Sequence, residues 1–389
     1  MVNKFYLRIL VLILVPIVGI LILRAFLKPN PEVTFTQFPG FTKYYENYPP
    51  QNSPPLPDEK VLLRKYLPRF FLPPNHPGAI DFYRDYIAQG RLVDAEEKLV
   101  VDKVDQEVLN KYRRKPGFQF IHEDKGEFQK LKPVVYGRID YDTLKLQDKK
   151  YPFTFLTYHI VFRTSGLPAG VPQWQQWFLN LIASTTNWHQ LDHYTAVTLA
   201  LDDNKNPVAV TMQQHNYLTT YLIGKNIQLP SDNRVKVDVA IASNELYPHK
   251  SGRVKRRAAS FMTPEAARYI IFGTEKPFLA AEDITHGVGE INYNLEFLPQ
   301  TDAFYTFQGR LGIKRSLPGR DAPPGSDYNT LPALKPKALT MIFYYRREND
   351  SEFIDLLEKA SKTWWNDDLS PELVEAFGKR FVSDWQKEK

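Results

Sequence analysis

The longest apolar run in the chain extends from Phe5 to Phe26 and contains only two charged residues, Arg8 and Arg24. A helix rises about 1.5 Å per residue, so this run is long enough to cross a hydrocarbon layer of about 30 Å. No small-residue cleavage pattern follows it, which favours an uncleaved signal anchor over a removed signal peptide. The pattern therefore predicts a transmembrane helix within residues 1–28 that contacts membrane lipid.

The charges that flank this run bear on its orientation. A short basic head precedes it, with Lys4 and Arg8, and this favours a single-pass protein whose body is periplasmic or extracellular. Arg24 and Lys28 on the other side weaken that bias, so a cytoplasmic body remains the alternative.

A proline-rich stretch follows, and residues 29–77 are predicted to form a semi-rigid extended stalk because proline fixes φ and disfavours helix in the residue before it. Residues 78–117 are predicted to be helical, with helices over Ile80–Gln89 and Val93–Arg114. In the second range Val101, Val104, Val108 and Tyr112 recur at helical spacing and form one apolar stripe. We expect this stripe to pack against the main body, with a partner-binding face as the alternative.

Residues 118–350 are dominated by segments rich in β-branched and aromatic residues, which predict strands. The clearest is a hairpin within Tyr194–Gln214, where Asp202 to Asn206 form a loop of turn-favouring residues. The predicted strands are Val134–Ile139, Phe153–Arg163, Tyr194–Leu201, Pro207–Gln214, Val235–Ala242, Ile291–Leu298 and Ala338–Tyr345.

Helices are predicted to interrupt these strands at Gln173–Ser184 and Thr263–Phe272, and residues 351–389 are predicted to form C-terminal helices. The last helix starts at Ser370 and Pro371 and carries an apolar stripe of Phe377, Phe381 and Trp385. The predicted fold class is α+β and mainly β, an antiparallel β-sandwich with peripheral helices after one transmembrane helix.

Composition excludes several kinds of chemistry. The chain has no cysteine, so disulfides, thiolate metal sites and cysteine nucleophiles are absent. A net charge of +6 is too small a basic excess to predict nucleic-acid binding. No P-loop, dinucleotide fingerprint or nucleophile elbow is present in the sequence.

The densest polar cluster comprises His189, Asp192 and His193, followed after the hairpin by His215. His189 and His193 have the spacing of a helical zinc motif, but Gln190 replaces the glutamate that a metalloprotease needs, and a strand is expected here. His159, on a neighbouring predicted strand, is a further candidate for a metal or ligand site.

The order of these segments resembles the vacuolar-protein-sorting-associated family sixty-two and the related necrosis-inducing proteins. The resemblance covers about Phe153 to Tyr247: H-x-x-D, P-V-A-V-T, Q-H and V-D-V-A-I-A-S-N stand in the family's order. It implies a β-sandwich in which His189, Asp192 and His215 match family positions. The necrosis-inducing proteins hold a divalent cation with acidic residues of this region, but Gln190 and Tyr194 replace both glutamates here.

Three interpretations of this cluster remain open: a hydrogen-bonded group that orients a loop, a metal or ligand site, and a catalytic site. We expect no cofactor, with a divalent cation as the alternative. Separately, a basic segment is expected either to be solvated or to contact lipid headgroups or an acidic partner through Arg253, Lys255, Arg256 and Arg257.

The sequence as a whole predicts a membrane-anchored, non-enzymatic accessory or structural protein whose β-rich body docks onto other membrane or envelope proteins. No intact catalytic motif is present, which makes an enzyme the less favoured class. The alternative is a hydrolase or a metal- or ligand-binding protein that uses His189, Asp192 and His215.

Overall fold

The computed structural model describes Gly19 and residues 53–122, 131–147, 149–164, 166, 191–193, 195–214, 217–250, 253–254, 283–284, 287–312, 338–345, 347, 350–353, 355–356 and 370–389. The central element of this part is a six-stranded sheet in the order β15-β5-β6-β7-β8-β9. Its strands are β5 (Val134–Leu146), β6 (Lys149–Ile160), β7 (Ala196–Leu201), β8 (Pro207–Gln214), β9 (Tyr217–Leu222) and β15 (Asn294–Phe297).

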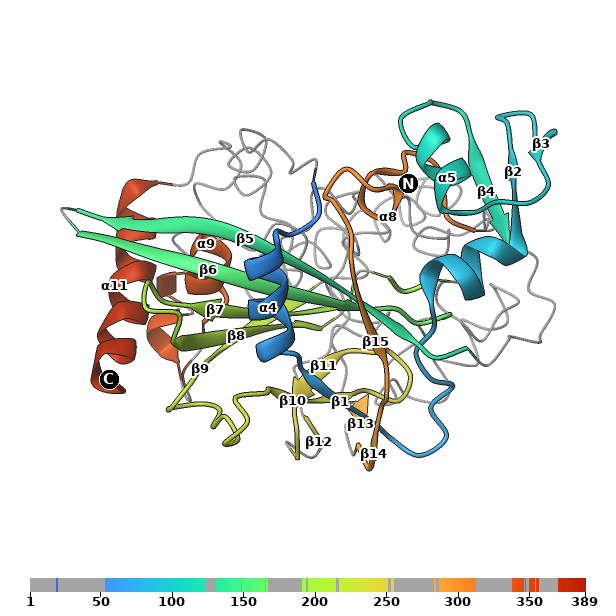
Figure 1. Cartoon of the computed structure of the whole chain (residues 1–389). Coiled ribbons are helices and arrows are strands. Elements are labelled where there is room, and N and C mark those ends of the chain that lie inside the picture. Colours follow the sequence, from blue (N-terminus) through green and yellow to red (C-terminus); the bar gives the residue numbers. More distant parts are fainter. Residues whose placement is uncertain are drawn as a thin grey trace, which may run out of the picture.

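Consecutive strands of this sheet from β5 to β9 pair antiparallel, whereas β15 pairs parallel with the beginning of β5. The turn between β5 and β6 is tight, because Leu146 lies opposite Lys149 and Gln147 has the left-handed φ of 46° that such turns require. This hairpin arm extends well beyond the other strands at the end near the C-terminus (Figure 1).

A four-stranded sheet packs against one face of the six-stranded sheet. It consists of β11 (Leu246–Pro248), β10 (Lys236–Val239), β1 (Arg69–Leu72) and β14 (Gly289–Glu290), in that order. Buried side chains such as Phe70 and Val237 meet Leu156 and Val197 of the larger sheet in one apolar cluster. Helix α4 (Pro57–Lys65) adds Leu63 to the same cluster.

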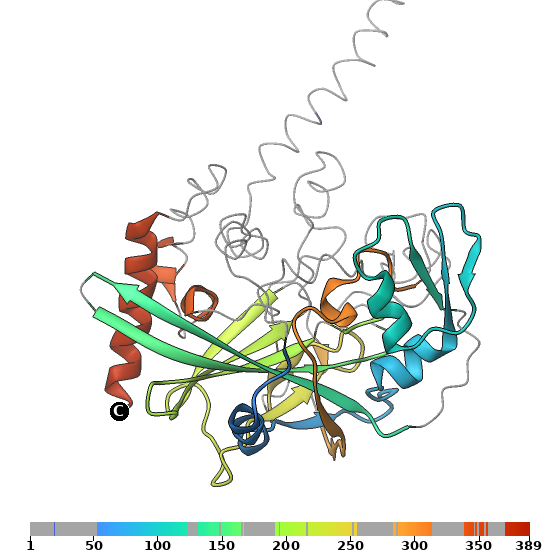
Figure 2. The ribbon, with the colours of Figure 1, turned by 45° about the horizontal axis from the view of Figure 1, so that its top comes forward.

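Two further apolar clusters cover the opposite face of the six-stranded sheet. At the hairpin end, α9 (Ala338–Phe343) and α11 (Pro371–Lys387) pack on β5 and β6 through residues such as Phe153 and Phe377. At the other end lie the π-helix η2 (Phe82–Tyr86), the 3-10 helix η3 (Ile87–Gln89), α5 (Gln106–Tyr112) and α8 (Ala303–Thr306). Figure 2 shows α11 alongside the end of the β5–β6 arm.

Two small sheets complete the described part. A three-stranded sheet contains β3 (Leu99–Val101), β2 (Gly90–Val93) and β4 (Gln119–His122), with β2 in the middle. A two-stranded ribbon pairs β12 (Arg253–Val254) with β13 (Asp283–Ile284).

Several predicted elements are confirmed. The hairpin within Tyr194–Gln214 forms as β7 and β8, joined by a turn in which Asp202 accepts the Asn206 amide at 2.9 Å. The C-terminal helix begins after Ser370, whose hydroxyl caps the Leu373 amide, and buries Phe377, Phe381 and Trp385 as the stripe predicted.

Other predicted elements are wrong. The range Val93–Arg114 does not form one helix, because β2, β3 and the short helix α5 divide it. The range Ala338–Tyr345 contains helix α9 instead of a strand. Within the predicted stalk, α4 and β1 are parts of the packed body, since β1 pairs with both β10 and β14. The helices predicted at 173–184 and 263–272 lie outside the described residues.

The predicted antiparallel β-sandwich with peripheral helices is also wrong as a fold class. The structure is a mixed α/β fold with several sheets and mostly strands, in which β1–β10 and β15–β5 pair in parallel. These parallel pairs join segments far apart in the chain, so strand patterns in the sequence could not reveal them.

Across the described ranges, no helix combines the length and apolar character needed to cross a membrane. This finding contradicts the single-pass transmembrane helix, the signal anchor and the membrane localisation with a periplasmic or extracellular body, and we correct all three predictions. The run from Phe5 to Phe26 on which they depended lies outside the described residues, apart from Gly19.

Candidate functional site

Asp192 is buried and engaged in hydrogen bonds. Its Oδ1 accepts the Thr195 hydroxyl at 2.8 Å, and its Oδ2 accepts the Asn244 side-chain amide at 2.9 Å. Asn244 has a left-handed φ of 58° and also donates to the Thr164 carbonyl at 2.7 Å. Asp192 therefore fixes two loops against each other at the end of β6.

His76 extends this network. Its Nε2 lies 3.1 Å from Asn244 Oδ1, and its Nδ1 accepts the Gly78 amide at 3.0 Å. Burial lowers the pKa of His76 to about 4, although the hydrogen bond to Asn244 opposes this shift. A neutral imidazole with its proton on Nε2 satisfies both contacts, so both ring nitrogens are already used.

His159 lies in different surroundings from Asp192. Its ring is 5.7 Å from that of Phe304 and 5.5 Å from that of Tyr305, between centroids, in the cluster around α8. His193 stacks at 5.4 Å on Phe82 in the same cluster. The structure thus brings His159 together with His193 and aromatic rings, and Asp192 together with Asn244 and His76.

The other predicted site residues are described partly or not at all. His189, His215, Lys255, Arg256 and Arg257 lie outside the described residues, and only the backbone of Arg253 is described, paired with Ile284 in the β12–β13 ribbon. In the described ranges, no group of three or more histidine and acidic residues could hold a metal ion.

A further histidine–carboxylate pair lies in the four-stranded sheet. His249 Nδ1 is 2.6 Å from Asp238 Oδ1, and the His249 ring stacks on Phe71 at 4.0 Å. Asp238 also accepts the Lys250 amide at 2.9 Å. Burial raises the pKa of Asp238 above its ordinary value, although these hydrogen bonds oppose the shift. The pair fixes the end of β11 onto β10.

The sequence predictions missed a site on the long arm formed by β5 and β6. On its outer edge β5 pairs with β15 only from Val134 to Gly137. From Arg138 to Leu146, no described strand pairs with this edge. Tyr141 on this edge is 47% exposed, and Lys145 is also exposed. The Thr143 amide donates at 2.8 Å to the Asp142 carboxylate, where a strand would otherwise supply a carbonyl.

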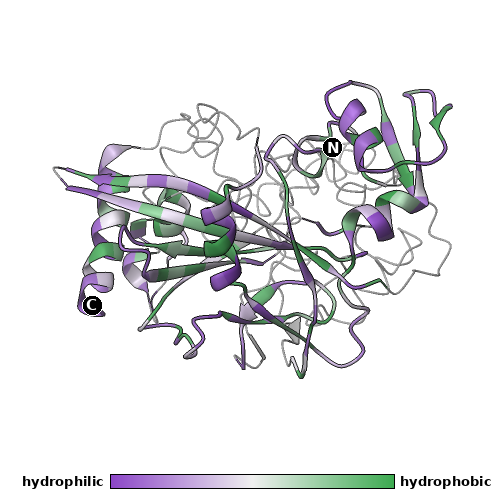
Figure 3. Cartoon of the chain, in the orientation of Figure 1, coloured by the Kyte–Doolittle hydropathy of each residue, from purple (hydrophilic) through white to green (hydrophobic). Residues whose placement is uncertain are grey.

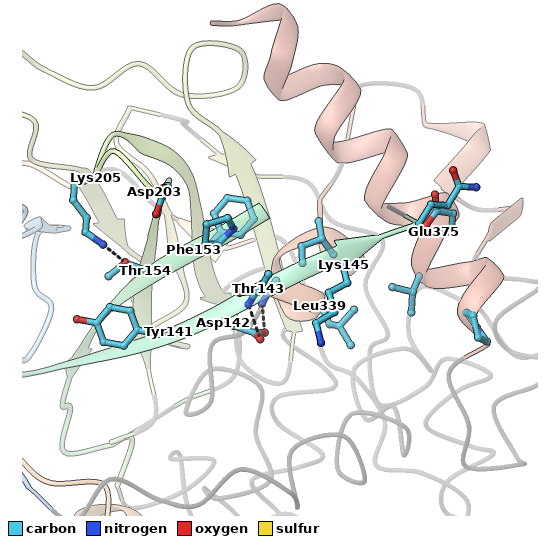
Figure 4. A pocket seen from close by; sticks show the side chains of 16 residues that line it. Tyr141, Asp142, Thr143, Lys145, Phe153, Thr154, Asp203, Lys205, Leu339 and Glu375 are labelled. Carbon is cyan, nitrogen blue, oxygen red and sulfur yellow. Dashed lines mark hydrogen bonds between the residues drawn. The ribbon is translucent and has the colours of Figure 1, made fainter. Parts of the chain in front are cut away.

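A pocket of about 820 Å³ borders the arm and is lined by residues of β5 and β6, of the turn between β7 and β8, and of the first turns of α9 and α11. Figure 4 shows its lining, with Lys205 hydrogen-bonded to Thr154 on one side of the arm and Leu339 and Glu375 on the other. The edge and the pocket together form what we call the β5 edge site: Tyr141 to Lys145 with the side chains that line the pocket.

The end of the arm is basic. Lys145 and Lys150 lie directly opposite each other in the antiparallel ladder, and Lys149 is adjacent. Like charges in directly opposed positions destabilise a sheet. No described residue forms an ion pair with any of these three lysines. Figure 3 shows hydrophilic residues at the end of this arm.

The signal for this site in the sequence was the run Lys145 to Lys150, in which lysines flank a short polar turn. The predicted strand Val134–Ile139 covers only the first part of β5, which continues to Leu146. An exposed edge with unpaired backbone groups can bind an extended peptide, and unpaired lysines favour an acidic one.

Comparison with known proteins adds no relative: the chain matches no family model, and no curated protein and no solved structure shows significant similarity to it. The resemblance of residues 153–247 to the vacuolar-protein-sorting-associated family sixty-two therefore stays a prediction.

Proposed function

We propose that this protein is a non-enzymatic accessory protein whose β5 edge site docks an extended, acidic segment of a partner protein. The observation that carries the proposal is the strand edge from Arg138 to Leu146, which has no described strand partner and borders a pocket of about 820 Å³.

The backbone of this edge supplies the binding contacts. At about 3.4 Å per residue, the part of β5 beyond Ile139 offers roughly 24 Å of strand for pairing. Addition of one strand to such an edge gives main-chain hydrogen bonds that depend little on the sequence of the guest, while neighbouring side chains supply specificity.

The charge of the site selects the kind of partner. Lys145 and Lys150 oppose each other across the ladder, with Asp148 between them in the chain, and Lys205 lines the pocket beside Asp203. Among the acidic side chains of the pocket, Asp142 accepts the Ala338 amide at 3.0 Å and Glu375 pairs with Lys379 at 3.1 Å. An acidic segment relieves the repulsion between the lysines, whereas a basic segment increases it.

The polar groups around Asp192 support a non-enzymatic role. The Asp192 carboxylate accepts hydrogen bonds from Thr195 and Asn244, and both nitrogens of His76 are used within the chain. A general base needs a nitrogen or oxygen within reach of its substrate. These groups instead fix loops, which favours binding over hydrolysis.

Thr143→Pro provides an edge-specific test. Thr143 lies opposite Pro152 in β6, and its amide donates to the Asp142 carboxylate and not to β6. Proline at position 143 therefore removes a donor from the outer edge and obstructs that edge, while the hydrogen bonds between β5 and β6 are kept. Thr143→Ala is the matched control, because it keeps the amide and removes the side chain.

The partner is first identified by crosslinking, with a photoreactive amino acid at position 141 of the protein in cells of the natural host. The crosslinked partner is then purified, and its affinity for each variant is measured by calorimetric titration. We expect Thr143→Pro to weaken binding by at least tenfold, which is a loss of at least about 1.4 kcal/mol in binding free energy. Thr143→Ala should change the affinity less than twofold. Equal binding by the two variants, or the absence of an adduct at position 141, contradicts the proposal.

A further inference from the structure

Strand β3 is an outer strand of the three-stranded sheet and exposes apolar side chains. It pairs with β2, and no other described strand pairs with it. Leu99 is 58% exposed and Val100 is 36% exposed, whereas Val101 packs against the apolar cluster around α5 and α8. Figure 1 shows β2 and β3 at the far end of the body from α11. Exposed apolar side chains on an outer strand favour contact with another chain.

The charges on the two sides of Val100 have opposite signs. Lys98 and Asp102 lie two positions before and after Val100, and Glu97 and Lys103 lie three positions before and after it. All four charged residues are exposed. A contact about a two-fold axis is self-complementary, because each residue meets the counterpart of its own partner in the second copy. With the axis at Val100, Lys98 therefore meets Asp102 of the second copy, and Glu97 meets Lys103.

We infer that β3 is the centre of a two-fold contact between two copies of this chain, in which the two strands run antiparallel across Val100. The charges select this register. A shift of the axis by half a residue toward Leu99 places Glu97 opposite Asp102, and the reverse shift places Lys98 opposite Lys103. Both shifted arrangements oppose like charges, which is unfavourable.

Three further residues, Asp94, Glu96 and Asp105, make this segment acidic as a whole. In the register centred on Val100, each of them lies opposite an uncharged position of the second copy, and their remaining repulsion is screened over about 8 Å at 0.15 M salt. Glu96 also forms an ion pair with Lys98 at 2.9 Å, but both side chains are 73% exposed. An exposed pair contributes little to stability, so Lys98 can exchange Glu96 for Asp102 of the second copy.

The contact is small and depends on side chains. The pairing of β3 with β2 shifts register between Leu92 and Val93, and such a bulge interrupts regular backbone pairing. Each copy contributes Leu99, Val100 and the four charged side chains, whereas a stable interface has about 20–30 residues a side. We therefore expect a transient dimer with a dissociation constant of about 0.1–1 mM. Such a dimer presents two β5 edge sites to one partner, although the contact at β3 does not depend on them.

Cysteine substitution tests the contact directly, because the chain has no cysteine of its own. Val100→Cys places a single thiol on the inferred axis, next to its counterpart in the second copy. Val61→Cys and Val288→Cys are the controls, since these valines are 63% and 70% exposed and lie on other parts of the fold. The rate of disulfide formation between two full chains is measured with oxidised glutathione. It is divided by the rate at which each thiol reacts with a neutral maleimide, which corrects for differences in thiol reactivity.

We expect Val100→Cys to crosslink at least tenfold faster than both controls. In the Val100→Cys background, Lys98→Glu and Asp102→Lys should each slow crosslinking at least fivefold, because each opposes like charges twice across the axis. An equal mixture of these two variants should regain the rate, since the introduced glutamate then meets the introduced lysine and the native Asp102 meets the native Lys98. Glu107→Lys and Lys111→Glu make the same charge changes at exposed positions on α5 and should change the rate less than twofold, alone or mixed.

Equal crosslinking at position 100 and at the two control positions overturns the inference, and so does a mixture that crosslinks no faster than either charge variant alone. Equal crosslinking would mean that the charges around β3 serve only to protect an exposed strand. No partner protein takes part in these measurements, so their outcome is independent of whether the β5 edge site docks an acidic segment.

Discussion

Besides its apolar face, helix α11 contacts the body through the buried carboxylate of Asp384, and removal of this charge has a predictable cost. Asp384 Oδ2 accepts hydrogen bonds at 2.7 Å from Lys225 Nζ, from Arg347 Nε and from the Tyr345 hydroxyl. The Asp384 side chain is only 4% exposed. Asp384→Asn keeps the shape of the side chain but removes its charge.

Breaking a buried ion pair on one side costs about 3–5 kcal/mol when the remaining charge has no other partner. Here the cost is smaller, because the side chains of Lys225 and Arg347 are 34% and 29% exposed and regain contact with water. Asparagine also retains one acceptor oxygen. We therefore expect Asp384→Asn to lower the free energy of unfolding by about 2 kcal/mol, equivalent to roughly 2–3 °C in Tm for a chain of this length.

The same group gives a pH dependence. Burial by itself raises the pKa of Asp384, but the hydrogen bonds from Lys225 and Tyr345 and the charge of Arg347 outweigh it and hold the pKa well below its usual range. A depressed pKa means that the stabilisation is fully present above the pKa of the unfolded chain, about 3.9, and is lost as pH falls below it. The difference between the wild type and Asp384→Asn should therefore shrink below about pH 4.

Urea denaturation followed by circular dichroism, at about pH 7 and at several values below about pH 4, measures both effects. Glu388→Gln is the matched control, since this exposed carboxylate ends the same helix, and it should change stability by less than about 0.5 kcal/mol. A loss below about 0.5 kcal/mol for Asp384→Asn, or a loss that stays constant to low pH, would refute the reasoning.

Two other buried features give predictions for the same denaturation assay. Asp302 caps α8 and accepts hydrogen bonds from Tyr83 and Asn110. Asp302→Ala leaves these buried donors unpaired, so it should lower the free energy of unfolding by about 3 kcal/mol. A loss below about 1 kcal/mol would show that water replaces the carboxylate as their acceptor. Gly287 packs so closely that an added Cβ would lie 2.6 Å from Phe71 Cβ and 2.8 Å from the Phe71 carbonyl oxygen. Gly287→Ala should therefore lower the free energy of unfolding by about 1–3 kcal/mol. An unchanged urea midpoint would contradict this close packing.

The sequence by itself determined those elements whose start, end and buried face are all specified by residues within the element. The β7–β8 hairpin follows from alternating apolar residues on both sides of a polar turn, and α11 follows from a serine cap, a first-turn proline and an apolar stripe. In both cases the residues that specify the element lie within it, so no distant partner is required.

Tertiary structure overrode the pattern where distant partners compete. Val101, Val104, Val108 and Tyr112 do pack into one cluster, as their helical spacing suggested, but Val101 belongs to a strand because β2 offers it a pairing partner. Residues 338–343 form a helix because Phe343 packs against Phe377 of α11, at 4.3 Å between ring centres. A short apolar run fits a strand and a buried helix equally well, and only its neighbours decide between them.

The candidate site was decided by tertiary structure alone. The sequence predicted a strand only as far as Ile139 in this region, and it offered Asp192 and His159 as candidates for a shared cluster. Only the fold revealed that Asp192 and His159 have different neighbours, and that β15 stops pairing with β5 at Gly137. Whether a strand edge is free depends on where distant segments end in space, and hydrophobic periodicity along one strand contains no record of that.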